Sequence, residues 1–203
     1  MAAASHSIVA PEGKPVIFSA IILLIALHVW LGAIVTPGWL LIVFMAWMFR
    51  DPVREVSSAP LGIVSPVDAR VISVSEEHDP YLDRQATKLA LEMSPLGMNS
   101  LRSITEGKVI NTWARHDNPG ERAVQVQTDE QDDVVVVLRP GRLFRQISCN
   151  ITAGQRVGQG QRCGYITFGA VIDVYIPVTA RCFLKAGDTV QAGSELLGEY
   201  IHE

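Results

Sequence analysis

The chain has 203 residues, 48% of them hydrophobic, and a formal net charge of −4. This length suits one compact domain with an appendage. The acidic balance and the lack of a basic stripe exclude nucleic acid as an expected partner, because phosphate binding needs a concentrated positive surface. The cysteines are an odd number without a CxxC pair, which favours reduced thiols, and no His or Cys spacing predicts a metal site.

The first feature along the chain is an apolar stretch. Residues 16–35 contain no Asp, Glu, Lys or Arg, and as a helix they would cross a hydrocarbon core of about 30 Å. Thr36, Pro37 and Gly38 then lead into a second apolar run rather than a cleavage site, so a signal peptide is disfavoured. The second run is too short to span comfortably. We therefore predict a transmembrane or re-entrant helical hairpin over 16–49.

Basic residues flank this hairpin. Lys14 precedes it and two arginines follow it, which by the positive-inside tendency places both flanks on the cytoplasmic side of the inner membrane. The remaining alternative is a hairpin buried in the core of a soluble protein. The residues predicted to lie at the membrane interface are Trp30, Trp39, Trp47, Arg50 and Arg54.

From residue 62 onward the chain consists of short segments rich in β-branched residues and separated by Gly, Pro, Asp and Asn. This pattern predicts a mainly β, antiparallel domain with short turns. The predicted organisation is an N-terminal tail (1–15), a membrane-anchoring hairpin (16–49), a linker (50–61) and a β domain (62–203).

The β domain contains an internal repeat. Residues 153–166 and 186–201 share the frame A-G-x-x-V-x-x-G followed by an apolar strand, at an offset of 33 residues. The glycines suit turn positions with positive φ, and the valine suits an inward position. We expect two related β units folded face to face, as in barrel-sandwich domains.

Several motifs, taken together, resemble the phosphatidylserine decarboxylase family, chiefly its short bacterial membrane-bound form. They are FRDPVR with SPVD behind it, MSPLGMNSLR, GER, GRLFRQI and GQRCGYITFGAVIDVYIP, in family order between residues 48 and 198. The resemblance implies an enzyme that cuts its own chain before a serine in a Gly-Ser pair and converts that serine into a pyruvoyl group. The group forms a Schiff base with the substrate amine. A histidine and an aspartate assist the cleavage.

This sequence departs from the family at the reactive positions. The family's aspartate falls on Asp68, which is present, but its histidine falls on Asn99, and an amide does not take up a proton near neutral pH. The family's serine falls on Ala170, after Gly169, and a methyl group has no oxygen from which a pyruvoyl carbonyl could form. No cofactor is therefore predicted, since the pyruvoyl group requires a serine at position 170.

Further departures lie close to these positions. Val171 and Gln146 stand where the family commonly has arginines, and Ala69 stands where it has a glycine, although Arg145 remains. The reactive pieces have thus changed while the scaffold motifs still fit. We interpret this pattern as natural degeneration rather than a single engineered change.

The sequence therefore predicts a membrane-anchored, unprocessed homologue that binds phospholipid headgroups, or pairs with a second copy or another lipid enzyme. Arg102 and Arg145 are candidate phosphate contacts, since guanidinium matches phosphate geometry. Asp173 is either a lone buried acid or a pocket residue beside Ala170. Two alternatives stay open: an active decarboxylase that makes phosphatidylethanolamine, as a trapped variant or through another processing residue, and a structural assembly subunit.

Overall fold

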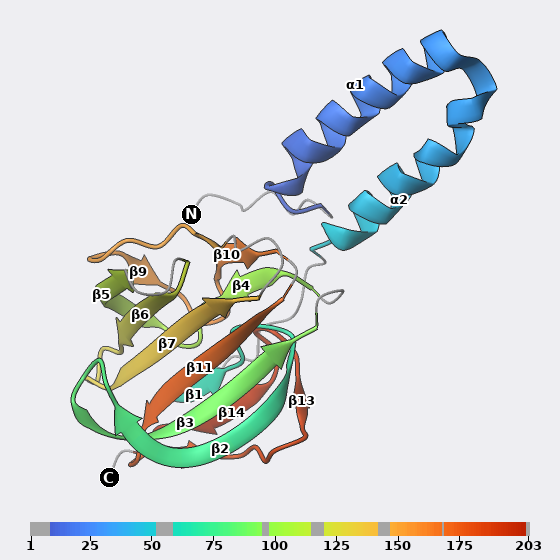
Figure 1. Ribbon diagram of the computed structural model, residues 1–203. Helices are drawn as coiled ribbons and strands as arrows, with labels where there is room; N and C mark the ends of the chain where they lie inside the picture. Colours follow the sequence, from blue (N-terminus) through green and yellow to red (C-terminus); the bar gives the residue numbers. More distant parts are fainter. Residues whose placement is uncertain are drawn as a thin grey trace. The chain divides into compact units, whose positions relative to one another are not determined.

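The structure is a computed structural model that describes residues 9–51, 59–94, 98–114, 120–141, 147–167 and 169–201. The chain divides into two compact units, Met1–Val53 and Arg54–Glu203. The first unit is helical, and the second is mainly antiparallel β sheet (Figure 1). This confirms the predicted fold class.

The first unit is a helical hairpin. Helix α1 (Gly13–Leu31) is followed by the 3-10 helix η1 (Gly32–Gly38) and by helix α2 (Trp39–Met48). Gly32 adopts a positive φ of 66° and its N–H donates to the carbonyl of His28, so it ends α1. Pro37 lies inside η1 and breaks the α-helical pattern. The turn therefore forms where the Thr-Pro-Gly stretch predicted a break.

The two ends of the hairpin are joined to each other. The Ala10 N–H donates to the Phe49 carbonyl across 2.8 Å, and Val9 forms an antiparallel bridge with Arg50. Helix α1 is about 28 Å long, and η1 and α2 together are about 29 Å. The returning arm thus matches the first in length, which the second apolar run alone does not. Both ends of the hairpin consequently lie together.

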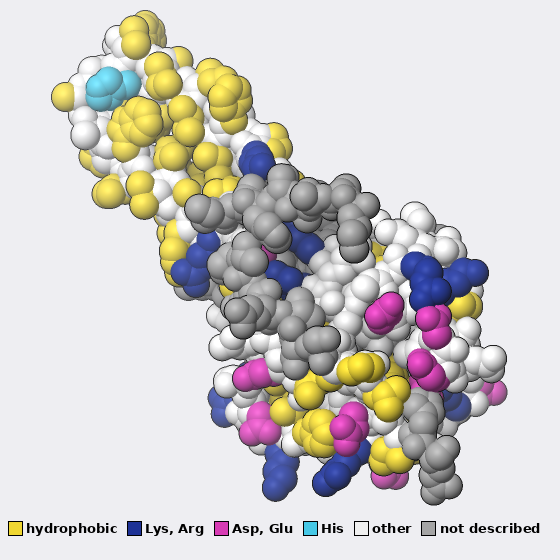
Figure 2. All heavy atoms as spheres, turned by 180° about the vertical axis from the view of Figure 1, so that it is seen from behind, with side chains coloured by type: hydrophobic (Ala, Val, Ile, Leu, Met, Phe, Trp, Pro, Cys, Tyr) yellow, Lys and Arg dark blue, Asp and Glu magenta, His cyan; other side chains and the backbone are white. Residues whose placement is uncertain are grey.

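The hairpin carries its apolar side chains on the outside (Figure 2). Among the described residues, the helical segment Gly13–Met48 is long and apolar enough to cross a membrane, and none of its most apolar window is buried. Trp30 is 85% exposed, and Arg50 lies over the Trp47 ring with its guanidinium carbon 5.0 Å from the ring centroid. Burial in lipid would remove this apolar surface from water, so the hairpin indicates membrane association. Arg54 lies outside the described residues.

The described residues of the second unit form one large and two small sheets, all with antiparallel pairing. The large sheet has the strand order β13 (Thr189–Val190), β2 (Ala69–Asp79), β3 (Arg84–Met93), β11 (Ala170–Pro177), β7 (Asp133–Pro140), β6 (Arg122–Gln127), β5 (Gly107–Ala114) and β9 (Arg156–Val157). The small sheets are β1 (Gly62–Val64), β14 (Leu196–Glu199) and β12 (Arg181–Cys182), and β4 (Ser100–Arg102), β10 (Arg162–Ile166) and β8 (Ile147–Cys149). The largest hydrophobic cluster takes residues from all three sheets.

The two sequence repeats occupy equivalent places in this unit. Strand β9 pairs with β5 and strand β13 pairs with β2, and the glycines at matching repeat positions donate to matching carbonyls. The bonds are Gly154 to Val109 and Gly187 to Val71, both 2.8 Å, and Gly160 to Ser103 (2.9 Å) and Gly193 to Ser65 (2.8 Å). All four glycines have positive φ, which explains the shared glycine spacing. The prediction of two related β units is confirmed.

Candidate functional site

The positions of the family's aspartate and serine lie at one end of the large sheet. The register places Ala69 opposite Met93, Val171 opposite Glu92 and Ala170 opposite Pro140. The start of β2, the end of β3, the start of β11 and the end of β7 therefore meet at one end. Because neighbouring strands are about 4.8 Å apart, Asp68 and Ala170 are separated by about 10 Å across the sheet.

Ala170 follows a turn that only glycine adopts readily. Gly169 has a φ of 81°, and its carbonyl accepts a hydrogen bond from the Gly141 N–H across 3.2 Å. Ala170 is 5% exposed and belongs to the largest hydrophobic cluster, together with Ile172 on the same face of β11. The turn is thus retained, while the side chain that it presents is a buried methyl group.

Asn99 is connected to the strand that leads into this turn. Its backbone carbonyl accepts from the Ile166 N–H across 2.7 Å, and its side-chain Nδ2 donates to the hydroxyl of Tyr165 across 3.1 Å. Asn99 is 1% exposed, and its Oδ1 has no hydrogen-bond partner among the described residues. A buried acceptor without a partner is costly, so this amide is held in an unfavourable setting.

Asp68 stabilises a turn of the second repeat. Its Oδ1 accepts a hydrogen bond from the Ala192 N–H across 2.8 Å, and the residue is half-buried. This hydrogen bond occupies one of the two carboxylate oxygens of Asp68. The aspartate that matches the family therefore also has a structural role here.

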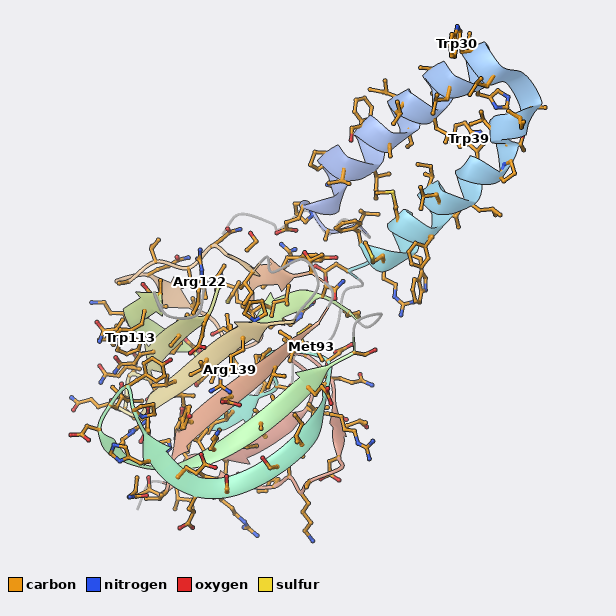
Figure 3. All side chains as sticks on the ribbon, in the orientation of Figure 1. Trp30, Trp39, Met93, Trp113, Arg122 and Arg139 are labelled. Atoms are coloured by element: carbon orange, nitrogen blue, oxygen red, sulfur yellow. The ribbon has the colours of Figure 1, made fainter. Side chains whose placement is uncertain are left out.

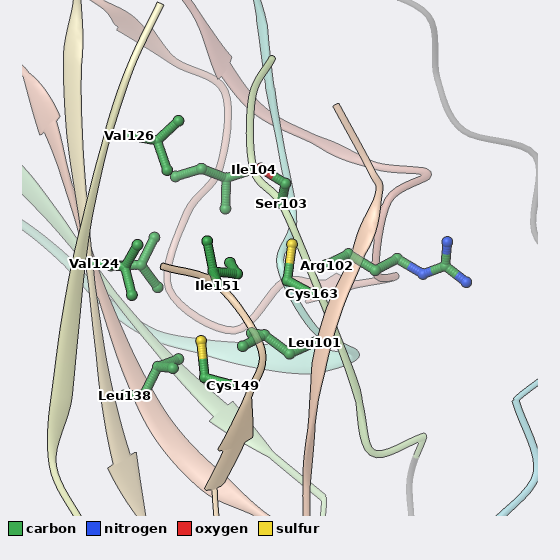
Figure 4. Close-up of a pocket in the computed structure, with 11 residues that line it drawn as sticks. Leu101, Arg102, Ser103, Ile104, Val124, Val126, Leu138, Cys149, Ile151 and Cys163 are labelled. Carbon is green, nitrogen blue, oxygen red and sulfur yellow. The ribbon is translucent and has the colours of Figure 1, made fainter. Parts of the chain in front are cut away.

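Of the two predicted phosphate contacts, Arg102 has structural partners and Arg145 lies outside the described residues. The Arg102 guanidinium donates to the Gly160 carbonyl across 3.1 Å, and its side chain lies against Gly193. Arg102 thus contacts matching turns of both repeats, and its side chain points away from the cavity drawn in Figure 4. This geometry favours a structural role for Arg102.

Asp173 lies on the opposite face of β11 from Ala170, because alternate residues of a strand point to opposite faces. Its Oδ2 is 2.6 Å from Nη2 of Arg139 and 3.8 Å from Nζ of Lys88, and the residue is 1% exposed. Arg139 is labelled on the sheet in Figure 3. Asp173 is therefore a buried acid with cationic partners, and the geometry does not place it in a pocket beside Ala170.

Sequence reasoning missed Arg122, the last residue of the GER motif. Arg122 is exposed and lines a groove of about 110 Å³ with Trp113 and Ile151. This groove shares Val124, Cys149 and Ile151 with an apolar cavity of about 30 Å³ (Figure 4). The GER motif was visible in the sequence, but the cross-strand register that brings Arg122 to this groove was not.

Burial also sets the chemistry of the cavity wall. Burial raises the pKa of the Cys163 thiol from 9.0 to about 12. The nearby Cys149 contributes a smaller part of this rise in pKa. Near neutral pH this thiol is protonated and behaves as a small apolar side chain.

An apolar hairpin followed by an antiparallel β domain, with a glycine turn leading into β11, defines a membrane-associated β protein. A sequence model described as phosphatidylserine decarboxylase matches residues 41–198. The phosphatidylserine decarboxylase proenzyme of Burkholderia vietnamiensis is 34% identical, with 96% of this chain and 97% of that protein covered. The proenzyme of Aromatoleum aromaticum is 35% identical, with 96% of both covered. The chain belongs to the phosphatidylserine decarboxylase family.

Proposed function

We propose that this chain is a membrane-anchored, unprocessed member of its family that binds phospholipid headgroups without decarboxylating them. The observation that carries the proposal is Ala170. The residues present do not fit a pyruvoyl group, because the Cβ of Ala170 has no oxygen for the acyl shift and none to become the carbonyl. Without this electron sink, binding a headgroup does not lower the barrier to loss of carbon dioxide.

A second change supports the same proposal. Asn99 stands where the family has the histidine that assists cleavage, and its amide cannot act as a base near neutral pH. Its hydrogen bonds to Tyr165 and Ile166 hold it beside the strand that precedes the Gly169 turn. Loss of both the nucleophile and the base favours a chain that stays intact.

The hairpin supports attachment to the inner membrane with the β domain on the cytoplasmic side. Its bonded ends at Ala10 and Phe49 require both ends to lie on the same side of the bilayer. Lys14 and Arg50 lie at these ends, which by the positive-inside tendency is the cytoplasmic side. The proposed linker to the β domain covers residues 50–61.

The intact mass of the protein, purified from its own membranes, tests the proposal. We expect one polypeptide of about 22.2 kDa. Recovery of a separate fragment beginning at residue 170 with a ketoacyl cap would overturn it. That result would support the second candidate, an active decarboxylase, which is favoured by relatives named as proenzymes over nearly the whole chain.

Lipid analysis of the purified protein separates headgroup binding from a purely structural role. If the protein binds headgroups, aminophospholipids will co-purify in a fixed ratio to protein after extensive detergent washing. A protein without a defined lipid ratio would instead support a structural assembly subunit. A second copy or another lipid enzyme bound to the chain would appear in the same preparation.

A further inference from the structure

The groove at Arg122 combines one cation with apolar walls. Its lining residues are Thr112, Trp113, Ala114, Arg122, Ala123, Val124, Cys149 and Ile151. Three of these also line the apolar cavity beside it. A ligand held here would meet a positive charge at the groove and apolar side chains next to it.

Strand register places Arg122 on the same face of the large sheet as Ala170. Arg122 lies opposite Leu138, and Leu138 lies opposite Ile172, which shares its face of β11 with Ala170. The Cα atoms of Arg122 and Ala170 are therefore two strands apart across the sheet and two residues apart along it. Together these spacings give a distance of about 12 Å. Leu138 and Ile172 lie between the two residues on this face and are buried in the core, so the groove at Arg122 is a site apart from Ala170.

No acidic side chain forms an ion pair with Arg122 within the described part of the chain. The preceding Glu121 points to the opposite face, where its carboxylate lies 3.8 Å from Nε of Arg139. Arg156 pairs with Asp129 at 2.6 Å, by contrast. Arg122 thus presents an exposed guanidinium at the groove, and it forms no ion pair with the described residues.

We infer that Arg122 binds the phosphate of a phospholipid headgroup in this groove. Guanidinium offers two parallel N–H donors that match two phosphate oxygens. The apolar side chains that line the groove itself favour a phosphate that belongs to a phospholipid over free phosphate. This inference rests on the proposed headgroup binding and names the residue that carries it.

Trp113 is next to Ala114, the residue opposite Arg122, but its ring packs against Tyr81 on the other face of the sheet, so its emission checks folding and calorimetry measures binding. The full chain, with the hairpin tryptophans replaced by phenylalanine, is titrated in detergent with dihexanoyl-phosphatidylserine, glycerophosphoserine and inorganic phosphate. Trp113 emission and calorimetry are followed in parallel. The variants are Arg122→Gln, Arg122→Lys and the control Arg181→Gln, and circular dichroism checks their folding.

We expect Arg122→Gln to weaken binding of the short-chain lipid about tenfold or more, Arg122→Lys to weaken it less, and Arg181→Gln to leave it unchanged. Equal binding by Arg122→Gln and the parent would overturn the role of Arg122 and leave headgroup binding standing. No calorimetric binding of any ligand by the parent would overturn both. Inorganic phosphate binding as tightly as the lipid would overturn the lipid assignment.

Discussion

The side-chain amide of Asn99 donates a hydrogen bond to the Tyr165 hydroxyl across 3.1 Å, and both residues are buried. The other end of this amide, Oδ1, has no hydrogen-bond partner in the part of the chain that the structure describes. An imidazole at this position would place a titratable ring next to the Tyr165 hydroxyl, on the strand that leads to Gly169. The scaffold for a base is therefore retained although the base is absent.

We expect the double variant Asn99→His, Ala170→Ser to cleave part of its own chain before residue 170. The serine supplies the oxygen for the acyl shift, and the histidine supplies the base that activates it. Electrophoresis and intact mass would show the C-terminal fragment, and Ala170→Ser alone, the matched control, should cleave less. A double variant that stays fully intact after prolonged incubation would show that these two positions do not suffice.

We expect Asp173→Asn to lower the free energy of unfolding by about 1–3 kcal/mol, because it leaves Arg139 and Lys88 beside a buried site without its charge. Because Arg139 is partly exposed, the decrease in the free energy of unfolding should be smaller than for a fully buried pair. Denaturant unfolding of the full chain in detergent measures the change. The control Asp129→Asn breaks a pair of the same 2.6 Å length that is exposed on both sides, and stability should hardly change. Equal effects of the two variants would contradict the role assigned to burial.

Cys163 should resist alkylation in the folded protein. Burial raises the pKa of its thiol to about 12, so the folded state binds this proton more tightly than the unfolded state does. The stability contributed by the thiol is fully present below pH 9 and decreases as the pH rises from about 9 to about 12. Iodoacetamide labelling at pH 8, read by peptide mass spectrometry, should modify the half-buried Cys182 first and Cys163 only after unfolding. Equal rates for both thiols in the folded chain would contradict this prediction.

The hairpin should return to the side of the membrane from which it enters. With the native cysteines replaced by alanine, single cysteines at Ser5 and Glu130 should react with an impermeant maleimide from the same side of sealed vesicles. Inverted vesicles serve as the control, since the accessible side is reversed. Labelling of the two positions from opposite sides would show a single crossing instead of a hairpin.

Local patterns in the sequence were sufficient for the hairpin and for the repeats. The uncharged run, the Pro37-Gly38 break and the shared glycine spacing act within a few turns of chain, so composition alone indicates them. The same holds for the missing groups at positions 99 and 170, because the absence of a hydroxyl or an imidazole is a property of the residue itself. No fold can restore them.

Other features depended on pairing between strands far apart in the sequence. They are the face of the sheet on which Asp173 lies, the structural partners of Arg102 and the position of Arg122. A shift of one residue in register would move each side chain to the other face of the sheet. The amino-acid sequence by itself thus determined which chemical groups the chain has available. Only the tertiary structure decided which of them share a face, because long-range hydrogen bonding sets the register.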